Sequence, residues 1–430
     1  MKKLNYIIIT ILLSCILLSG CYDRKELDDL TYIMAIGLDK GTTNNLRMTL
    51  QYAVPLAIGG GGGSSGGGGG PKSVSNVTVE CPSLYAGLNM INNFVGKQVT
   101  FSHAKLIIFS EELIQGGQMV NIVRAFLRGR EFRPNMYVAV SRGSAEDYIK
   151  SVIPIQEADP SKYYELKFSA YTYTGFTANT QIHNFIVNTT SPAIQPVATL
   201  IGVGKYEASK DFIDKSTALT KGRPNPLEGD YKAGDIPKTG DIKGETMGLA
   251  VFDGLNLVGE LDGAEATNYL MATGEFKHAY MTFPDPQAKD RYIILDVKQS
   301  RKPVRRVEFV DGKPKIDIKV MLEADFLSIQ SGINYENVEN TGIFEKSTQE
   351  FLKMDIEKLL SRTTKEFHSD ICGFGKETKS KFLTWNEWAR INWLGIYKDS
   401  SFNVNVNLKV RRPGLMIRSS PIFSSEGERK

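Results

Sequence analysis

The stretch Val304–Gln330, VRRVEFVDGKPKIDIKVMLEADFLSIQ, decides the fold of the C-terminal part of the chain. Asp311-Gly312 in its middle is a dipeptide that favours a tight hairpin turn, and the residues on both sides of it have strand character. Another strand-like run, Tyr292–Gln299, precedes the stretch. The sequence therefore predicts three antiparallel strands, over residues 292–299, 304–310 and 315–330.

A long helix and a final strand are expected to follow. Apolar residues recur at near-helical spacing over Thr341–His368, which predicts a helix. Phe402–Val410 alternates strictly between apolar residues and Asn or Lys, which is typical of a strand with one buried and one wet face. We therefore expect residues 286–430 to form a domain with an antiparallel sheet and a long helix.

The N-terminal part has a different pattern. Over residues 21–195, strand-like runs alternate with helical segments, which predicts a mixed α/β domain. Strands are expected over 32–38, 47–55, 75–80, 105–109 and 136–141, and helices over 83–95 and 118–127, with Ser144 opening a further helix. The Gly/Ser run 59–70 is expected to be an expanded surface loop between two strands.

Residues 196–285 are more polar and less periodic. Two short strands, over 247–252 and 256–261, are expected around the turn Asp253-Gly254, with a short helix over 264–273 after them. This pattern predicts a small middle domain with a long polar insertion. The expected fold class is therefore α/β (α+β), in three domains that follow a signal peptide.

Residues 1–20 have the layout of a bacterial lipoprotein signal peptide. Lys2 and Lys3 precede an apolar run, Ile7–Leu18, that is shorter than the roughly 20 apolar residues of a transmembrane helix. The sequence LSGC at residues 18–21 then fits the lipobox, which implies cleavage between Gly20 and Cys21 and diacylglycerol on the Cys21 thiol. Two or more acyl chains, such as palmitate, give stable membrane attachment. The alternative is an uncleaved anchor that ends in a chance cysteine.

Charge and composition exclude two broad classes of protein. The chain has 52 Lys and Arg against 48 Asp and Glu, so no basic surplus exists to neutralise a phosphate backbone. Nucleic acid is therefore not an expected partner. With 41% hydrophobic and 23% charged residues, the composition is that of a folded protein, and wholesale disorder is excluded.

No motif argues for catalysis. The four histidines stand apart from one another, and the chain has neither a phosphate-binding glycine loop nor a GxSxG nucleophile elbow. We therefore expect no catalytic residue, no metal and no cofactor, and the protein is expected not to be an enzyme. Cys81 and Cys372 either form one disulfide or remain two buried thiols, and we favour the second interpretation.

Two patches have both a functional and a structural interpretation. The first is a run of cations around Pro303, which either contacts a partner or anionic lipid headgroups or is the solvated end of a hairpin. It consists of Lys298, Arg301, Lys302, Arg305 and Arg306. The second holds all three tryptophans of the chain, Trp385, Trp388 and Trp393, which are either a core or an exposed partner anchor. We favour the structural interpretation for both.

Several segments resemble the Ger(x)C family of spore germination lipoproteins. CYDRKEL at 21–27 is similar to the family's start, Cys-Trp-Asp-x-x-Glu-[Ile/Leu]. The resemblance continues, in the family's order, through AIGLD at 35–39, SHAKLIIFS at 102–110, RPN at 133–135, AVF at 250–252, LVG at 257–259, SDICGFG at 369–375, Trp385 with Trp388, and VRRPG at 410–414. The departures are Tyr22 for Trp, Cys372 for an apolar residue and Pro413 for Thr.

The resemblance implies a three-domain C subunit of a germinant receptor. It would be held by lipid on the outer face of the spore inner membrane, with an integral A subunit and a transporter-like integral B subunit as partners. It leaves open whether this subunit contacts the germinant. A second hypothesis is a solute-binding lipoprotein that delivers a small molecule to a transporter, which would predict two similar lobes around a cleft.

Overall fold

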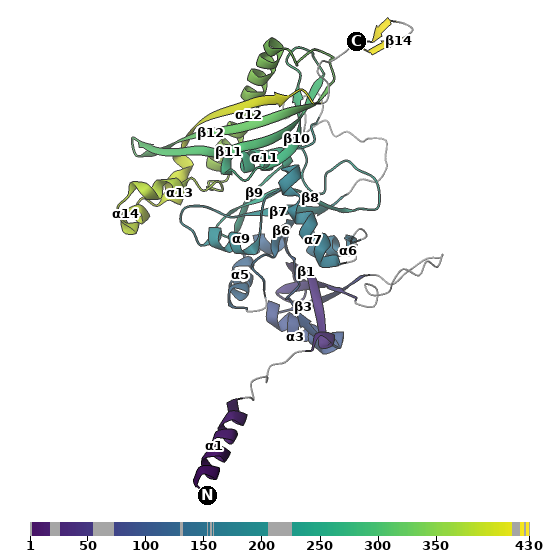
Figure 1. The fold of residues 1–430 in the computed structure, drawn as a ribbon, viewed down its shortest axis with the longest axis vertical. Helices are drawn as coiled ribbons and strands as arrows, with labels where there is room; N and C mark the ends of the chain where they lie inside the picture. The colour runs from purple at the N-terminus through teal and green to yellow at the C-terminus, as the bar shows by residue number, and fades with distance from the viewer. Residues whose placement is uncertain are drawn as a thin grey trace.

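Two β-sheets form the body of the protein, and the N-terminal helix stands apart from them (Figure 1). The computed structural model describes residues 2–17, 26–54, 73–129, 132–152, 154, 157, 159–204, 226–414, 422–424 and 427–429. The Gly/Ser run 59–70 lies outside these residues, and so does the first part of the polar insertion, residues 205–225. The helix that stands apart is α1 (Lys2–Leu17), from the expected signal peptide.

The larger sheet has nine strands in the order β3-β2-β1-β5-β6-β7-β8-β9, with β4 paired to β1. The antiparallel end consists of β1 (Leu30–Lys40), β2 (Leu46–Ala53) and β3 (Val74–Cys81), which confirms the strands predicted over 32–38, 47–55 and 75–80. β5 (Leu106–Ser110), β6 (Tyr137–Ser141) and β7 (Val197–Val203) continue from β1 in parallel. The short β4 (Gln98–Thr100) pairs with the start of β1.

Helices cover both faces of this sheet because its strands are apolar on both sides. One face packs on α3 (Leu84–Val95), α4 (Glu111–Gln115), α5 (Met119–Arg128) and α9 (Ile182–Thr189). The other packs on α6 (Ala145–Ser151) and α7 (Pro160–Ser169), and α8 (Tyr171–Thr174) follows α7. The helices predicted over 83–95 and 118–127 are confirmed. Ser144 caps α6 as predicted, since its hydroxyl accepts a hydrogen bond from the backbone N of Asp147 at 3.2 Å.

The segment expected as a middle domain is shared between the two sheets. β7, β8 (Gly244–Asp253) and β9 (Asn256–Leu261) extend the larger sheet, whereas β10 (His278–Pro284) belongs to the smaller one. The two strands and the short helix predicted here are present, the helix as α11 (Gly263–Thr273). This segment has no sheet of its own, since its strands belong to the same sheets as the strands of its neighbours. The division into three domains therefore stays a prediction.

The smaller sheet has the order β10-β11-β12-β13, and it corrects two expectations. β11 (Tyr292–Val310) is one strand where two were predicted, because the backbone absorbs Pro303 as irregularities in its pairing with β12 (Lys313–Ile329). β13 (Ser401–Arg412) pairs with β12 in parallel, so the sheet is mixed and not wholly antiparallel. The reason is α12 (Val338–Lys365), the predicted long helix, which carries the chain back along the sheet before β13 begins.

The turn between β11 and β12 is the one that the sequence predicts. Asp311 and Gly312 have φ angles of 50° and 76°, the positive values that a tight hairpin turn requires at both central positions. The predicted alternation of β13 is also confirmed, since Val404, Val406 and Leu408 are buried while Asn403 and Asn405 are exposed.

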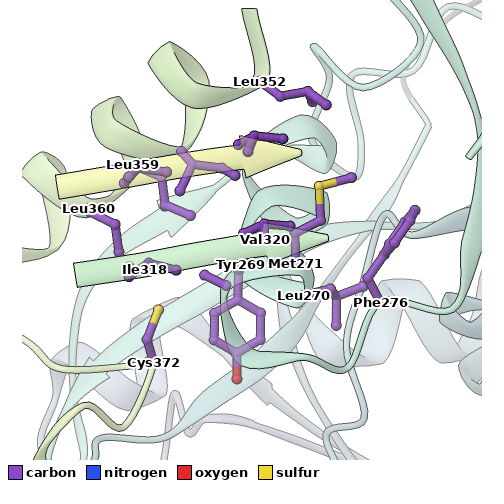
Figure 2. Packing of buried hydrophobic residues seen from close by; sticks show 14 of the residues in the cluster. Tyr269, Leu270, Met271, Phe276, Ile318, Val320, Leu352, Leu359, Leu360 and Cys372 are labelled. Atoms are coloured by element: carbon purple, nitrogen blue, oxygen red, sulfur yellow. The ribbon is translucent and has the colours of Figure 1, made fainter. Parts of the chain in front are cut away.

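One continuous apolar core joins the two sheets through α11. Figure 2 shows Tyr269, Leu270 and Met271 of α11 packed beside Ile318 and Val320 of β12, with Leu352, Leu359 and Leu360 of α12 above them. The same cluster includes Leu249 and Val251 of β8 in the larger sheet. Since α11 contacts both sheets, burying its apolar side chains fastens the two parts of the molecule together.

Candidate functional site

The expected lipid site, Gly20 and Cys21, lies outside the described residues. The first element after it is a short 3-10 turn, Leu27–Asp29, which leads directly into β1. In the part of the chain that the structure describes, every helix falls short of the length and apolarity that crossing a bilayer requires.

The cations around Pro303 do not form one cluster. Arg305 turns inward, where it donates to the backbone O of Cys372 at 2.8 Å and pairs with Glu377. Arg306 is the next residue in the strand, so it points to the opposite face of the sheet and is exposed. Arg301 and Lys302 are also exposed, whereas Lys298 pairs with Asp296 at 3.0 Å. Among the described residues, Arg301, Lys302 and Arg306 have no carboxylate partner.

The tryptophans are mainly structural. Trp388 and Trp393 are 2% and 1% exposed, and each indole N–H donates a hydrogen bond, to the hydroxyl of Thr378 at 2.6 Å and to the carboxylate of Asp370 at 2.8 Å. The core interpretation is therefore confirmed for these two. Trp385 differs, because it is 56% exposed, and its ring is tilted by 39° against that of Trp388 with ring centroids 5.0 Å apart.

The segment Ser369–Gly375, which carries the SDICGFG motif, ties the two sheets to each other. The hydroxyl of Ser369 donates to the backbone O of Phe252 at the end of β8, at 2.6 Å. The backbone O of Asp370 accepts from the N–H of Gln195, just before β7, at 2.8 Å. Both bonds reach from the end of α12 to the larger sheet, so this segment complements the apolar contact made by α11.

The Asp370 carboxylate organises this junction from a fully buried position. It accepts hydrogen bonds from the backbone N of Gly373 at 2.7 Å and of Gly375 at 2.9 Å, and from Trp393. Burial raises the pKa of Asp370, and these hydrogen bonds oppose that shift because they favour the ionised form. Gly375 is required here, since a Cβ atom would lie 2.5 Å from the Trp393 ring.

Cys372 in the same segment and Cys81 are both buried free thiols, as we expected.

A second polar link joins α11 to α12. Asp262 and Glu265 form a capping box at the start of α11, and Glu265 also pairs with Arg362 of α12. The ion pair is largely shielded from solvent, with side chains 15% and 24% exposed. The junction between the sheets therefore has a specified geometry, because hydrogen bonds and charge pairs fix directions that apolar packing alone leaves free.

A pair of carboxyl groups lies where α4 of the larger sheet meets β9. Burial and the neighbouring Glu260 carboxyl raise the pKa of Glu111 to about 7. Arg142 supports Glu260, with Nε 3.4 Å from its carboxylate, and Lys232 pairs with it at 2.8 Å. Glu111 and Glu260 can therefore share a proton near neutral pH, although no group of His, Cys, Asp or Glu in the described chain is arranged to hold a metal ion.

A cavity with a volume of about 550 Å³ lies beside α7. Its walls come from α6 to α8 and from the segment that leads into β8. Lys167 of α7 and Glu245 of β8 both line it. A smaller cavity of about 400 Å³ opens beside Asp39 and Arg47, but charged groups in its wall already have partners: Lys40 pairs with Glu112 at 3.1 Å, and Arg47 pairs with Glu146 at 2.6 Å.

Comparisons with known proteins cover both halves of the chain. A family described as "Spore germination protein N-terminal domain" matches residues 23–203, and one described as "Spore germination B3/ GerAC like, C-terminal" matches residues 247–414. The chain belongs to the Ger(x)C family of spore germination proteins. The resemblance seen in the sequence is therefore confirmed.

Relatives of this Ger(x)C protein match along its length. Spore germination protein KC of Bacillus subtilis (strain 168) is 26% identical over 425 residues, which is 96% of each chain. Spore germination protein B3 of the same organism is 21% identical over 409 residues, 91% of this chain and 94% of that protein. The crystal structure of the GerBC protein has a TM-score of 0.50 at 15% identity, and the match covers 87% of this chain and 96% of that one. This likeness confirms the fold.

Two of the Ger(x)C motifs gain a physical explanation from the fold. The stretch 369–375 forms the junction between the sheets, and Gly259 of the LVG stretch faces Phe367, whose ring would lie 2.2 Å from a Cβ at that position. The cavity beside α7 was not predicted. Its walls come from segments as far apart as Ser151 and Thr246, and neither segment has a spacing that would mark it in the sequence.

Proposed function

We propose that this chain is the C subunit of a spore germinant receptor, a non-catalytic lipoprotein needed for receptor assembly and nutrient-triggered germination. One observation carries the proposal. The N-terminal family match begins at residue 23, two residues after the lipobox cysteine, and the second match ends at residue 414. The family region therefore begins where cleavage and lipidation at Cys21 would start the mature chain.

The proposed place of the subunit is the outer face of the spore inner membrane. There, lipid on Cys21 would hold it beside the integral A and B subunits that the family resemblance implies. Confining the partners to one membrane raises their effective concentration, so a weak contact between them becomes sufficient for assembly. Arg301, Lys302 and Arg306 are exposed cations without a described partner, and we propose them as contacts to anionic headgroups or to another subunit.

The junction between the sheets suits an adaptor role. A subunit that holds two partners in a fixed relation needs a body that does not bend between its binding surfaces. This body has two connections across the junction. The apolar core around α11 is one, and the polar contacts of Asp370 and Glu265 are the other. The charged groups buried at the junction form hydrogen bonds with the backbone or ion pairs with each other. These contacts account for their burial, so a catalytic role is not needed to explain it.

Replacing Cys21 by alanine tests the anchor. The Cys21→Ala chain should fold, because the strands of the two sheets begin after the lipid site, at Leu30, but it should leave the membrane fraction and reduce nutrient-triggered germination by about tenfold or more. The measurements are membrane fractionation of spores and the loss of optical density after nutrient addition. Restoring membrane attachment with an unrelated transmembrane helix should recover germination. Full germination by a chain that is soluble in the spore would contradict the proposal.

A further inference from the structure

The two patches that the sequence singled out lie beside each other in the structure. Arg305 of β11 pairs with Glu377, and the ring of Phe309, near the end of β11, lies edge-on to that of Phe382 with ring centroids 6.5 Å apart. The end of the β11–β12 hairpin therefore packs against the segment 376–390, which contains two of the three tryptophans.

Two large side chains of this segment project into solvent. Trp385, which begins α14 (Trp385–Arg390), is 56% exposed, and Leu383 is 97% exposed. An apolar residue just before the N-cap of a helix often packs back against the first turn, but Leu383, which precedes the cap Thr384, does not. Figure 1 shows α14 and the free end of the β11–β12 hairpin on the same side of the molecule. Leu383 and Trp385 therefore form a protruding apolar tip.

Lysines border the apolar tip. The Lys379 ammonium lies 5.2 Å from the ring centroid of Trp385 and 5.3 Å from that of Trp388, close enough for a cation–π contact with both rings. Lys381 is also exposed. Among the described residues, neither lysine has a carboxylate within ion-pair distance. Both ammonium groups therefore keep N–H donors for an anionic partner.

The surface around the apolar tip is mainly positive. Glu377 forms the ion pair described above, and Glu387 accepts a hydrogen bond from the backbone N of Leu383 at 3.2 Å. Glu308 of the hairpin precedes Phe309 in the strand, so it points to the opposite face of the sheet. Against the two glutamates of the segment 376–390 stand four cations, Lys376, Lys379, Lys381 and Arg390. This balance favours an anionic surface as the partner.

We propose that the apolar tip inserts into the headgroup region of an anionic lipid bilayer, with Lys379 and Lys381 bound to lipid phosphates. Tryptophan suits this region because its ring is apolar and its N–H is polar. Lysine can keep its ammonium among the headgroups while its stem lies against apolar groups. The inference rests on the proposed membrane attachment at Cys21 and gives the chain a second contact with the same membrane.

A bilayer fits this surface better than a protein partner does. Stable protein interfaces bury about 800 Å² on each side around a well-packed centre, whereas the apolar tip consists of Leu383 and Trp385 alone. A chain that is already tethered needs only a weak second contact, since the tether keeps the local concentration of lipid high. The apolar tip and its lysines are therefore sufficient to orient the tethered chain on the membrane.

Tryptophan fluorescence of the full-length chain tests the bilayer contact. The chain, with its N-terminal anchor, is reconstituted into vesicles that hold no other protein and whose phospholipids carry brominated acyl chains, which quench an indole that they contact. Because Trp388 and Trp393 are buried, quenching reports mainly on Trp385. Quenching should be at least about threefold stronger with phosphatidylglycerol present than with phosphatidylcholine alone, and salt at about 1 M should remove the difference.

Protein variants place the contact at the apolar tip. Trp385→Phe should abolish the lipid-dependent quenching, and Leu383→Asn and Lys381→Gln should each reduce it by about half or more. These side chains are exposed, so their replacement leaves the core intact. Leu327→Asn is the matched control, because Leu327 is 52% exposed at the end of β12 away from the hairpin turn. This variant should not change the quenching.

Flotation in a density gradient separates this inference from the proposed anchor. A chain that floats with both kinds of vesicle but is not quenched would overturn the bilayer contact and leave the anchor standing. Unquenched fluorescence is also the result expected if a protein covers the apolar tip. Equal quenching in both lipids, or unchanged quenching in the Leu383→Asn chain, would overturn the contact as well. A chain that floats with neither kind of vesicle would contradict both the contact and the anchor.

Discussion

Two buried carboxylates in this protein, Asp39 and Asp370, are held by backbone N–H groups at the beginnings of turns and helices. Asp39, at the end of β1, accepts from the N–H groups of Ala145 and Glu146 in the first turn of α6, at 2.8 and 2.9 Å. Asp370 does the same for Gly373 and Gly375. Charge placed at a helix start or in a turn with converging N–H groups is stabilised without a cation. Each of these residues therefore fixes how two distant parts of the chain meet.

Glu111 gives a prediction about pH at the scale of one residue. Its pKa rises from 4.5 to about 7 in the fold, so the folded chain keeps a proton that the unfolded chain loses. This contribution to stability is fully present below about pH 4.5 and is lost as pH rises through about 7. Glu111→Gln removes this contribution. Between about pH 5 and 8, the free energy of unfolding of the Glu111→Gln chain should therefore fall less than that of the unmodified chain, by on the order of 1 kcal/mol after solvent screening.

Urea unfolding at several pH values measures this difference. Glu112→Gln is the matched control, because the neighbouring carboxylate is 71% exposed and pairs with Lys40 on the surface. Its pH dependence should follow that of the unmodified chain. A Glu111→Gln chain with the same pH dependence as the unmodified protein would contradict the shared proton between Glu111 and Glu260.

At the scale of elements, the packing of β9 against the end of α12 depends on a missing side chain. A Cβ atom on Gly259 would lie 2.2 Å from the Phe367 ring, and Phe367 is itself buried at 5% exposure. Gly259→Ala should therefore destabilise the fold by about 1–3 kcal/mol, because the ring cannot move away from a filled core. Thermal or urea unfolding of the variant gives the difference in free energy.

Gly342→Ala is the control for this substitution. Gly342 lies within α12, and apart from its chain neighbours and the nearby backbone of its own helix, no atom lies within 4 Å of its added Cβ. Alanine has the higher helix propensity, so this variant should be neutral or more stable by up to about 1 kcal/mol. Equal destabilisation by both substitutions would mean that the contact with Phe367 does not explain the requirement for glycine at 259.

Periodicity predicted elements where the local sequence decides them. The Asp311-Gly312 turn, the alternation of Phe402–Val410 and the long apolar spacing of α12 each reflect nearby residues, and the structure confirms them. Strand partners are decided by distant residues, and two expectations failed there. Two strands were expected on either side of Pro303, but β11 runs through it with irregular pairing to β12. The pairing of β13 is parallel because α12 carries the chain back along the sheet.

For the candidate sites too, features decided by nearby residues were predictable, whereas features decided by distant residues were not. The resemblance in motif sequences identified the family, and Trp388 and Trp393 were correctly assigned to the core. The role of Arg305 was not predictable, because its inward direction depends on Glu377 and Cys372, which follow it by about 70 residues. The cavity at Lys167 was also invisible, since a single lysine in an amphipathic helix has no distinguishing pattern.

At the scale of the whole molecule, two sheets share one core and face different surroundings. The larger sheet is covered on both faces, whereas β11 to β13 bury one face under α11 and α12 and leave Lys315, Asn403 and Asn405 exposed on the other. An uncovered polar face beside a firmly joined core suits a protein that presents a surface to others. This arrangement agrees with the proposed role of a subunit fixed at a membrane.

Affinity purification of the tagged chain from detergent-solubilised spore membranes tests the central claim most directly. We expect two integral membrane proteins to co-purify, one of them transporter-like, and to be identified by mass spectrometry. A parallel purification of the Cys21→Ala chain should recover less of both. Recovery of the tagged chain alone, under detergent conditions in which a known receptor complex of the same membrane stays intact, would contradict the claim that this protein is a stable receptor subunit.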